Sequence, residues 1–353
     1  MKRFGTPDKI GYLFGDLGND LFFILASNYL SIFYMRVLGI SGAVVGTLFL
    51  AARFVDAVTD ITMGRIVDTR RKNRGGRFRP WIKRMSIPVV LAGIFMFLPQ
   101  AAALPYSWKL VYIYVSYLLW GSICYTAINI PYGSMASALT ADPVERTSLS
   151  TFRSVGAALA GVVVGSGVPF VIYTYDTQGN QLVLGHRFLP LVLTFGVFAL
   201  VCYYLCYRLC RERVEIGRQE KKRLGFKRTL LGLIRNQALL AIIAAAIVLL
   251  LSMLLAGTMN TFLFMDYFKS KEAMAVAGML QTVSTLLLAP FAATIARRFG
   301  KKEASGVAVL FAAAVYFLLF LIRLRNPWVF CIFIFVGNLG SGLFNLMIRS
   351  EEH

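Results

Sequence analysis

The chain has 353 residues, of which 58% are hydrophobic and 15% are charged, and its formal net charge is +20. This composition, with a mean hydropathy of +0.66, lies far from that of soluble domains and excludes an ordinary water-soluble protein. The positive charge alone would fit nucleic-acid binding, so its distribution along the chain decides between the two explanations.

Apolar runs of about 20 residues recur along the sequence, each long enough to cross about 30 Å of hydrocarbon as a helix. They lie at 10–35, 42–66, 85–104, 110–135, 149–174, 188–208, 237–264, 273–296, 304–323 and 327–348. Their length and continuity favour helices over the alternating strands of a membrane barrel. The sequence therefore predicts an all-α membrane protein with about ten transmembrane helices.

Most of the 37 Lys and Arg residues fall on alternate connections between these runs. The largest clusters lie from Arg70 to Arg84 and from Arg208 to Arg235. This is the pattern of cytoplasmic loops when the N-terminus is cytoplasmic, and a nucleic-acid surface would not alternate in this way. We therefore expect a multi-pass protein of the cell membrane, in contact with lipids and not with nucleic acid.

The segment 209–236 is the only long polar stretch and is rich in Arg, Lys and Glu. It predicts a basic cytoplasmic linker between an N-terminal six-helix bundle, 1–208, and a C-terminal bundle of four helices, 237–353. A weak repeat supports this division, because the basic stretches Gly64–Lys72 and Ala296–Lys302 follow the second span of each half. Duplicated bundles of this kind occur in transporters, with the substrate site near the membrane midplane.

Four aspartates lie inside the apolar spans, and all four fall on the first two. Asp16 with Asp20, and Asp56 with Asp60, are each four residues apart, which places each pair on one face of a helix. A carboxylate at the centre of a membrane helix costs about 2.5–3.5 kcal/mol, so such groups need a wet cavity and a partner. A helical rise of about 1.5 Å per residue puts both pairs at matching depths on antiparallel helices. The pattern predicts an ion or proton pathway.

Two neighbouring residues affect the charge of this region. Arg53, one turn from Asp56, can neutralise only part of it, and Thr59 adds a hydroxyl beside Asp60. Carboxylate and hydroxyl oxygens are ligands of hard cations, so we expect Na⁺, or a proton in its place, among these four acids. The alternative is a buried salt-bridge network that only holds helices together.

The fourth span carries a second polar group, Thr126 and Asn129, three residues apart and on one side of the helix. Pro131 follows and frees a backbone carbonyl, which a membrane helix tolerates beside a cavity or a neighbouring helix. Lining of a cavity and hydrogen bonding between helices are both open for these residues. Arg153, which opens the fifth span, either reaches the membrane interface or faces a ligand.

The sequence offers no set of catalytic residues. Its two histidines, His186 and His353, lie outside the polar spans, and no phosphate loop, nucleotide fingerprint or H-E-x-x-H motif is present. We therefore expect a protein that is not an enzyme, needs no cofactor and is not driven by ATP.

Several stretches of the sequence resemble one known family. They are Gly11–Asp20, Arg53–Asp60 with Met63-Gly64, Gly76–Trp81, Trp120-Gly121 with Asn129–Tyr132, and Phe152-Arg153. These stretches are similar to motifs of the glycoside–pentoside–hexuronide:cation symporters, the melibiose-permease relatives within the major facilitator superfamily. The likeness covers nearly the whole chain and is most specific in its first half.

The resemblance implies roles for two groups of residues. The coupling cation, Na⁺, Li⁺ or H⁺, would bind at Asp56, Asp60, Thr126 and Thr59. The sugar would bind at Asp20, Arg153, Asn19 and Asn129.

The chain also differs from the melibiose type. Asn129, Asn19 and Gly133 stand where that type has an aspartate, a lysine and a tryptophan. These differences remove a carboxylate, a charge and a stacking ring, so we expect a different glycoside, or a hexuronide attracted to Arg153.

Members of the family have twelve helices, whereas this sequence predicts ten, the last ending near Ile348. The interpretation drawn from this count is a truncated member, in which the C-terminal bundle keeps four helices. A compact ten-helix protein completed by dimerisation is the less favoured hypothesis, and the sequence does not specify an oligomeric state.

The resulting hypothesis is a secondary active symporter that couples uptake of a glycoside, pentoside or hexuronide to Na⁺ or H⁺ by alternating access. Two other functions are left open. One is a lysolipid carrier of the same superfamily, which would need an apolar cavity with a lateral opening. The other is a non-transporting or inactive membrane protein.

Overall fold

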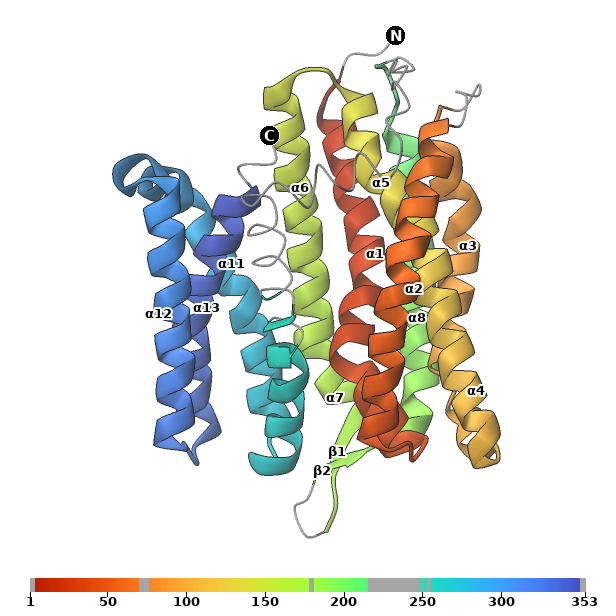
Figure 1. The fold of residues 1–353 in the computed structure, drawn as a ribbon, viewed down its shortest axis with the longest axis vertical. Helices are drawn as coiled ribbons and strands as arrows, with labels where there is room; N and C mark the ends of the chain where they lie inside the picture. Colours follow the sequence, from red (N-terminus) through yellow and green to blue (C-terminus); the bar gives the residue numbers. More distant parts are fainter. Residues whose placement is uncertain are drawn as a thin grey trace, which may run out of the picture.

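The computed structural model describes residues 4–69, 76–177, 181–214, 248, 251–252 and 255–349. Long helices run side by side along one axis, and the described residues contain one short hairpin of strands besides them (Figure 1). Within the described residues, seven helical stretches are long and apolar enough to cross a membrane. They are Gly42–Thr69, Arg79–Ala103, Tyr106–Leu139, Pro143–Ile172, Gly185–Leu209, Glu303–Ile322 and Pro327–Phe344. Two further helices, α1 (Thr6–Ile32) and α11 (Lys271–Phe299), have similar lengths and run alongside them.

The first part of the chain forms six such passes, several of them interrupted by a π-helical or 3₁₀ segment. In chain order they are α1 with η1 (Phe33–Val37); α2 (Gly42–Thr69); α3 (Arg79–Met96) with η2 (Pro99–Ala103); α4 (Tyr106–Tyr117), η3 (Leu118–Tyr125) and α5 (Thr126–Leu139); α6 (Pro143–Val162), η4 (Val163–Gly167) and α7 (Val168–Ile172); and η5 (Gly185–Arg187) with α8 (Phe188–Leu209). The helix α6 begins at Pro143 rather than at the predicted residue 149, because Asp142 caps it by accepting a hydrogen bond from the Val144 N–H.

The sequence analysis did not predict the hairpin between α7 and α8. Strands β1 (Tyr173–Tyr175) and β2 (Gln181–Val183) pair antiparallel, with Tyr173 opposite Val183. The β-branched and aromatic residues of β1 favour extended backbone, so the predicted fifth span ends at Ile172 instead of residue 174. The hairpin projects from the end of the molecule opposite the start of α1 (Figure 1), and Asp8 lies in the first turn of that helix. We refer to these as the hairpin end and the Asp8 end.

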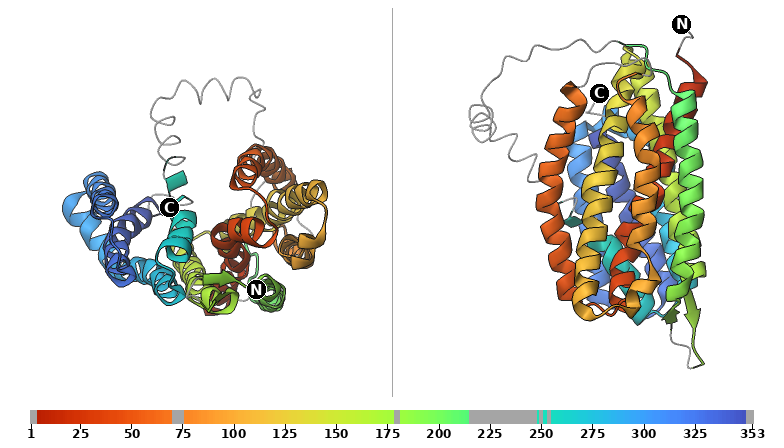
Figure 2. Two further views of the ribbon diagram at one scale, coloured as in Figure 1. Left: turned by 90° about the horizontal axis from the view of Figure 1, so that it is seen from below. Right: turned by 90° about the vertical axis from the view of Figure 1, so that its right-hand side faces the viewer.

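The last part of the chain contains the helical residues 255–262, η6 (Leu263–Tyr267), α11, α12 (Lys301–Ile322) and α13 (Pro327–Arg349). Helix α11 packs against α6, η4 and α7 on one side and against α12 and α13 on the other, so it joins them to the first six passes (Figure 2). The predicted linker, 209–236, and seventh span, 237–264, lie largely outside the described residues. The division into two bundles therefore stays a prediction.

Glycines let the central helices approach closely. A Cβ atom on Gly156 of α6 would lie within 2.4 Å of the Leu13 carbonyl oxygen of α1, and one on Gly278 of α11 would lie 2.8 Å from the backbone of Gly165 in η4. Any larger residue would push these helices apart. The first contact holds α6 against the face of α1 that carries Asp16.

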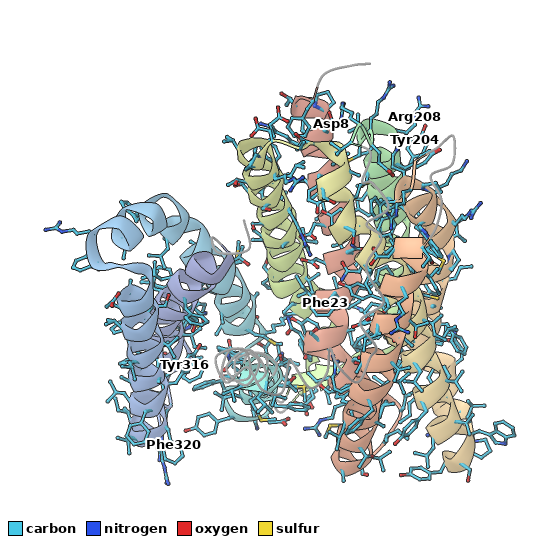
Figure 3. The ribbon with its side chains drawn as sticks, turned by 45° about the horizontal axis from the view of Figure 1, so that its top comes forward. Asp8, Phe23, Tyr204, Arg208, Tyr316 and Phe320 are labelled. Atoms are coloured by element: carbon cyan, nitrogen blue, oxygen red, sulfur yellow. The ribbon has the colours of Figure 1, made fainter. Side chains whose placement is uncertain are left out.

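At the Asp8 end, residues that follow α8 fasten three helices together. Both carboxylate oxygens of Asp8 accept hydrogen bonds from Arg213, at 2.9 Å each. Glu212 accepts the backbone N–H groups of Arg77, Phe78 and Arg79 at the start of α3, at 2.6–2.8 Å. Figure 3 shows Asp8 and Arg208 at this same end. The carboxylate of Glu212 thus satisfies N–H groups that a helix N-terminus leaves without partners.

Candidate functional site

The two aspartates of α2 meet two hydroxyl groups of the fourth pass. Ser122 donates a hydrogen bond to Asp56 Oδ1 at 2.5 Å, and Thr126 donates one to Asp60 Oδ1 at 2.8 Å. In each hydrogen bond the hydroxyl residue follows its aspartate by 66 residues. This is expected when two parallel helices carry partners at the same four-residue spacing. We call Asp56 and Asp60 the α2 acidic pair.

The fourth pass is π-helical where it meets this pair. The segment η3 ends at Tyr125, Ser122 lies inside it, and the Thr126 hydroxyl is also 3.4 Å from the Gly121 carbonyl oxygen. Such π-helical turns are rare and often occur at functional sites, because they leave backbone carbonyls without regular partners. On its other side η3 contacts α1, where Phe23 stacks on Tyr125 with ring centroids 5.5 Å apart (Figure 3).

Positive charge compensates the α2 acidic pair only in part. Arg53 Nη1 lies 3.4 Å from Asp56 Oδ2, while Nη2 of the same guanidinium donates to the Tyr117 hydroxyl at 3.0 Å. The Arg53 side chain is 57% exposed and that of Asp56 is 21% exposed. Two carboxylates and two hydroxyls therefore gather at one helix contact beside a single guanidinium, a set of oxygen atoms suited to a hard monovalent cation or a proton.

Thr59, a predicted cation ligand, has its hydrogen bonds within α2. Its hydroxyl donates to the carbonyl oxygens of Val55 and Asp56, at 3.1 Å each. This local bonding is common for threonine inside a helix. The predicted role of Thr59 stays a prediction, and the structure shows its proton already in use.

The other aspartate of the sequence pattern, Asp16, faces a different helix. Arg153 of α6 donates its Nε–H to Asp16 Oδ1 at 2.9 Å. The Asp16 side chain is 5% exposed and that of Arg153 is 43% exposed. The guanidinium also lies 5.6 Å from the ring centroid of Tyr132, which stacks on Tyr12. Three of the four aspartates, expected as one cluster at matching depth, are thus divided between two contacts, Asp16 with Arg153 and the α2 acidic pair with the fourth pass.

The remaining sugar-binding candidates lie around these contacts. Asp20 is half-buried, one turn beyond Asp16 on α1, and Asn129 is half-buried, three residues beyond Thr126. Asn19 is buried and accepts a hydrogen bond from the Tyr203 hydroxyl of α8 at 2.8 Å, so it lies in the contact between α1 and α8. Their roles toward a sugar stay predictions.

Sequence reasoning missed Ser122, Tyr117 and Tyr132. A signal existed for Ser122, because it precedes Thr126 by four residues, the same spacing as in the α2 acidic pair. For the two tyrosines the sequence contained no such signal, since aromatic residues are frequent throughout the spans.

Comparison with known proteins supports a transporter. The family described as MFS/sugar transport protein matches residues 11–350 of the chain. The chain is 30% identical over 347 residues to the uncharacterized symporter YjmB of Bacillus subtilis (strain 168), covering 98% of this chain and 73% of that protein.

Two further relatives carry the names of sugar compounds. The glucuronide carrier protein homolog of Escherichia coli (strain K12) is 27% identical, over 95% of this chain and 71% of the relative. The isoprimeverose transporter of Lactiplantibacillus pentosus is 30% identical, over 86% of this chain and 62% of the relative.

The fold agrees with these matches. The structure resembles the crystal structure of the nucleoside transporter NupG with a TM-score of 0.67, over 98% of this chain and 82% of the other, at 13% identity. The predicted all-α fold of major facilitator type is confirmed, and the protein crosses the membrane several times. Relatives and structural neighbours alike are transporters and not enzymes. The chain belongs to the MFS/sugar transport protein family, which confirms its resemblance to the glycoside–pentoside–hexuronide:cation symporters.

Proposed function

We propose that the protein is a secondary active symporter that couples uptake of a sugar to Na⁺ or H⁺. It would lie in the cell membrane with a cytoplasmic N-terminus and work by alternating access between an N-terminal and a C-terminal bundle. The observation that carries this proposal is the contact of the α2 acidic pair with Ser122 and Thr126.

This contact suits a coupling site because a cation would act between two helices. Carboxylate oxygens of α2 and hydroxyl oxygens of η3 and α5 would surround it, and its charge would offset the repulsion between Asp56 and Asp60. A bound cation would therefore stabilise one arrangement of these helices. Coupling follows if a sugar prefers the same arrangement, since each ligand then raises the affinity for the other by the same factor.

The proposed sugar site lies beside it. Asp16 holds the guanidinium of Arg153 in place, which leaves the exposed part of that group and the nearby Asp20 and Asn129 as candidates for hydrogen bonds to sugar hydroxyls. The names of the glucuronide carrier homolog and the isoprimeverose transporter support a sugar as substrate.

Contacts at the hairpin end support alternating access. Arg36 of η1 pairs with Asp266 of η6 at 2.6 Å, and the Tyr175 hydroxyl donates to Glu272 of α11 at 2.6 Å. With a cytoplasmic N-terminus this end faces outward, so these contacts would close the outer side. Opening the site to the outside would require both contacts to break.

The experiment that tests the coupling site is calorimetry of Na⁺ binding to the purified protein. Asp60→Asn removes one carboxylate of the pair, and we expect at least about tenfold weaker binding, a difference of about 1.4 kcal/mol. Asp68→Asn is the matched control, because Asp68 lies on the same helix but is 73% exposed at its end, and should bind Na⁺ as the unaltered protein does.

The same purified protein can be used to distinguish proton coupling from Na⁺ coupling. If Na⁺ does not bind, proton uptake on adding sugar is measured in weakly buffered solution, and Asp60→Asn should abolish it. A folded protein that binds no Na⁺ and exchanges no proton with sugar would contradict the proposal.

A further inference from the structure

A cavity of about 120 Å³ lies between the first six passes and the last helices. It is separate from the α2 acidic pair. Its lining comes from α1, η4, the helical residues 251–252 and 255–262, η6, α11, α12 and α13. Tyr316, labelled on α12 in Figure 3, forms part of its wall.

The described lining residues combine polar and apolar groups, and none of them is charged. Three carboxamides, of Asn28, Asn260 and Asn338, meet there with the hydroxyls of Thr261 and Ser341. Carboxamides both donate and accept hydrogen bonds, which matches the dual character of sugar hydroxyls. The tyrosine hydroxyl of α12 donates to Asn338 Oδ1 at 3.0 Å, which orients that amide.

Asn28 reaches across the contact between the two parts of the molecule. Its Oδ1 lies 3.2 Å from the position that a Cβ on Gly257 would occupy, so the glycine leaves the space that this carboxamide fills. Tyr29 and Phe264 add aromatic surface to the wall, and such surface packs well against the C–H face of a sugar ring.

The size suits one ring. The volume is of the same order as that of a cavity of about 150 Å³ that holds benzene, also a six-membered ring. The cavity is partly open, so the substituents of a ring could extend out of it.

The charges nearby disfavour an anion. None of the described residues that line the cavity is cationic, and against them an anionic sugar would have to leave water without a counter-charge. Arg153 is already paired with Asp16, which lies twelve residues before Asn28, about 18 Å away along α1.

We infer that this cavity is a subsite for an uncharged glycosyl unit, so that the transported sugar is a neutral glycoside rather than a hexuronide. The inference rests on the proposed function, sugar transport, but not on cation coupling. It assigns Asn28, Asn260 and Asn338 as residues that determine specificity.

The test is calorimetry of sugar binding to the full chain in saturating NaCl. The uncharged probes are the methyl glycosides of glucose, galactose and xylose, and the charged probe is methyl β-D-glucuronide. We expect at least one uncharged probe to bind at least about tenfold more tightly than the glucuronide. Asn260→Ala and Asn338→Ala should each weaken that probe about fivefold, the usual effect of one hydrogen bond. Gln100→Ala, an exposed amide outside the cavity, should leave it unchanged.

Na⁺ binding, measured in the same samples, separates this inference from the proposed coupling. If Asn260→Ala and Asn338→Ala weaken sugar binding but Na⁺ does not change the sugar affinity, the subsite is upheld and the coupling is contradicted. Unchanged affinity in both asparagine variants, equal binding of the glucuronide, or no binding of any uncharged probe would overturn the subsite, whatever Na⁺ does.

A second measurement does not depend on the stability of the asparagine variants. Ser341→Cys places a thiol of nearly the same size in the cavity wall, and the five native cysteines are buried, which keeps background alkylation low. The uncharged probe should slow alkylation of this thiol by a maleimide at least about threefold, because it occupies the cavity. Equal rates with and without the probe would overturn the inference.

Discussion

Asp16 and the α2 acidic pair belong to the same sequence pattern, aspartates four residues apart in an apolar span, but they differ in their surroundings. Asp16 is 5% exposed and receives a guanidinium N–H at 2.9 Å. Asp56 and Asp60 are more exposed and receive hydroxyl hydrogen bonds, with one guanidinium at 3.4 Å from Asp56. Arg153 compensates the charge of Asp16, whereas the two carboxylates of the α2 acidic pair share one guanidinium, and we propose that a mobile cation supplies the remaining charge.

The comparison teaches that a buried acid by itself does not identify an ion site. An arginine within hydrogen-bond distance makes a carboxylate part of the framework, because breaking such a pair leaves an uncompensated charge. Hydroxyl partners orient a carboxylate without cancelling its charge.

The largest expected effect is on stability, at Asp16. Arg153→Ala should lower the free energy of unfolding by about 3 kcal/mol, at the lower end for a buried pair because Arg153 is 43% exposed. An unfolding titration with dodecyl sulfate in detergent measures it. The double variant Asp16→Asn with Arg153→Ala should recover part of the loss. Equal losses in both variants would show that Arg153 stabilises the protein through other contacts.

The next effect is on cation affinity. Ser122→Ala removes the hydroxyl that orients Asp56, and we expect about fivefold weaker Na⁺ binding by calorimetry. Thr126→Ser keeps its hydroxyl and should bind Na⁺ nearly as the unaltered protein does. An unchanged affinity in Ser122→Ala would mean that this hydroxyl only joins the two helices.

An exposed ion pair serves as the comparison for the stability loss expected in Arg153→Ala. Arg36 and Asp266 are 47% and 50% exposed, so solvent screens their attraction. Arg36→Ala should lower the free energy of unfolding by less than about 1 kcal/mol in the same titration. A loss as large as that of Arg153→Ala would remove burial as the explanation for the difference between the two pairs.

The smallest effect is expected at Thr59. Its hydroxyl bonds to carbonyl groups of its own helix, whereas those of Ser122 and Thr126 bond to the acidic pair, so Thr59→Val should change the Na⁺ affinity by less than about twofold. A tenfold loss would place the Thr59 oxygen on the cation, as the family resemblance implies.

Much of the architecture followed from the apolar runs. Their lengths predicted the passes, and most helix ends lie within several residues of the predicted limits, because a helix is the only way for a single apolar run to satisfy its backbone in lipid. The hairpin after Ile172 and the π-helical η3 did not follow, because each depends on a few local hydrogen bonds in a sequence that is apolar on both sides.

The candidate site was predicted in part. Asp60 and Thr126 were named from the family resemblance, and the structure places them 2.8 Å apart. Ser122 was missed, although its spacing to Thr126 matched that of the acids. The partner of Asp16 was also missed, because Arg153 follows it by 137 residues and no local pattern connects them.

The sequence by itself determined that the chain spans a membrane, to which family it belongs and which helices carry its acids. These properties depend on hydrophobic length and on spacing along single helices, both of which can be read from neighbouring residues. The tertiary structure alone decided which acid meets an arginine and which meets a hydroxyl, and it alone formed the cavity of asparagines. Those outcomes depend on which helices pack together, and close approaches such as that of Gly156 to Leu13 determine this packing between residues far apart in the chain.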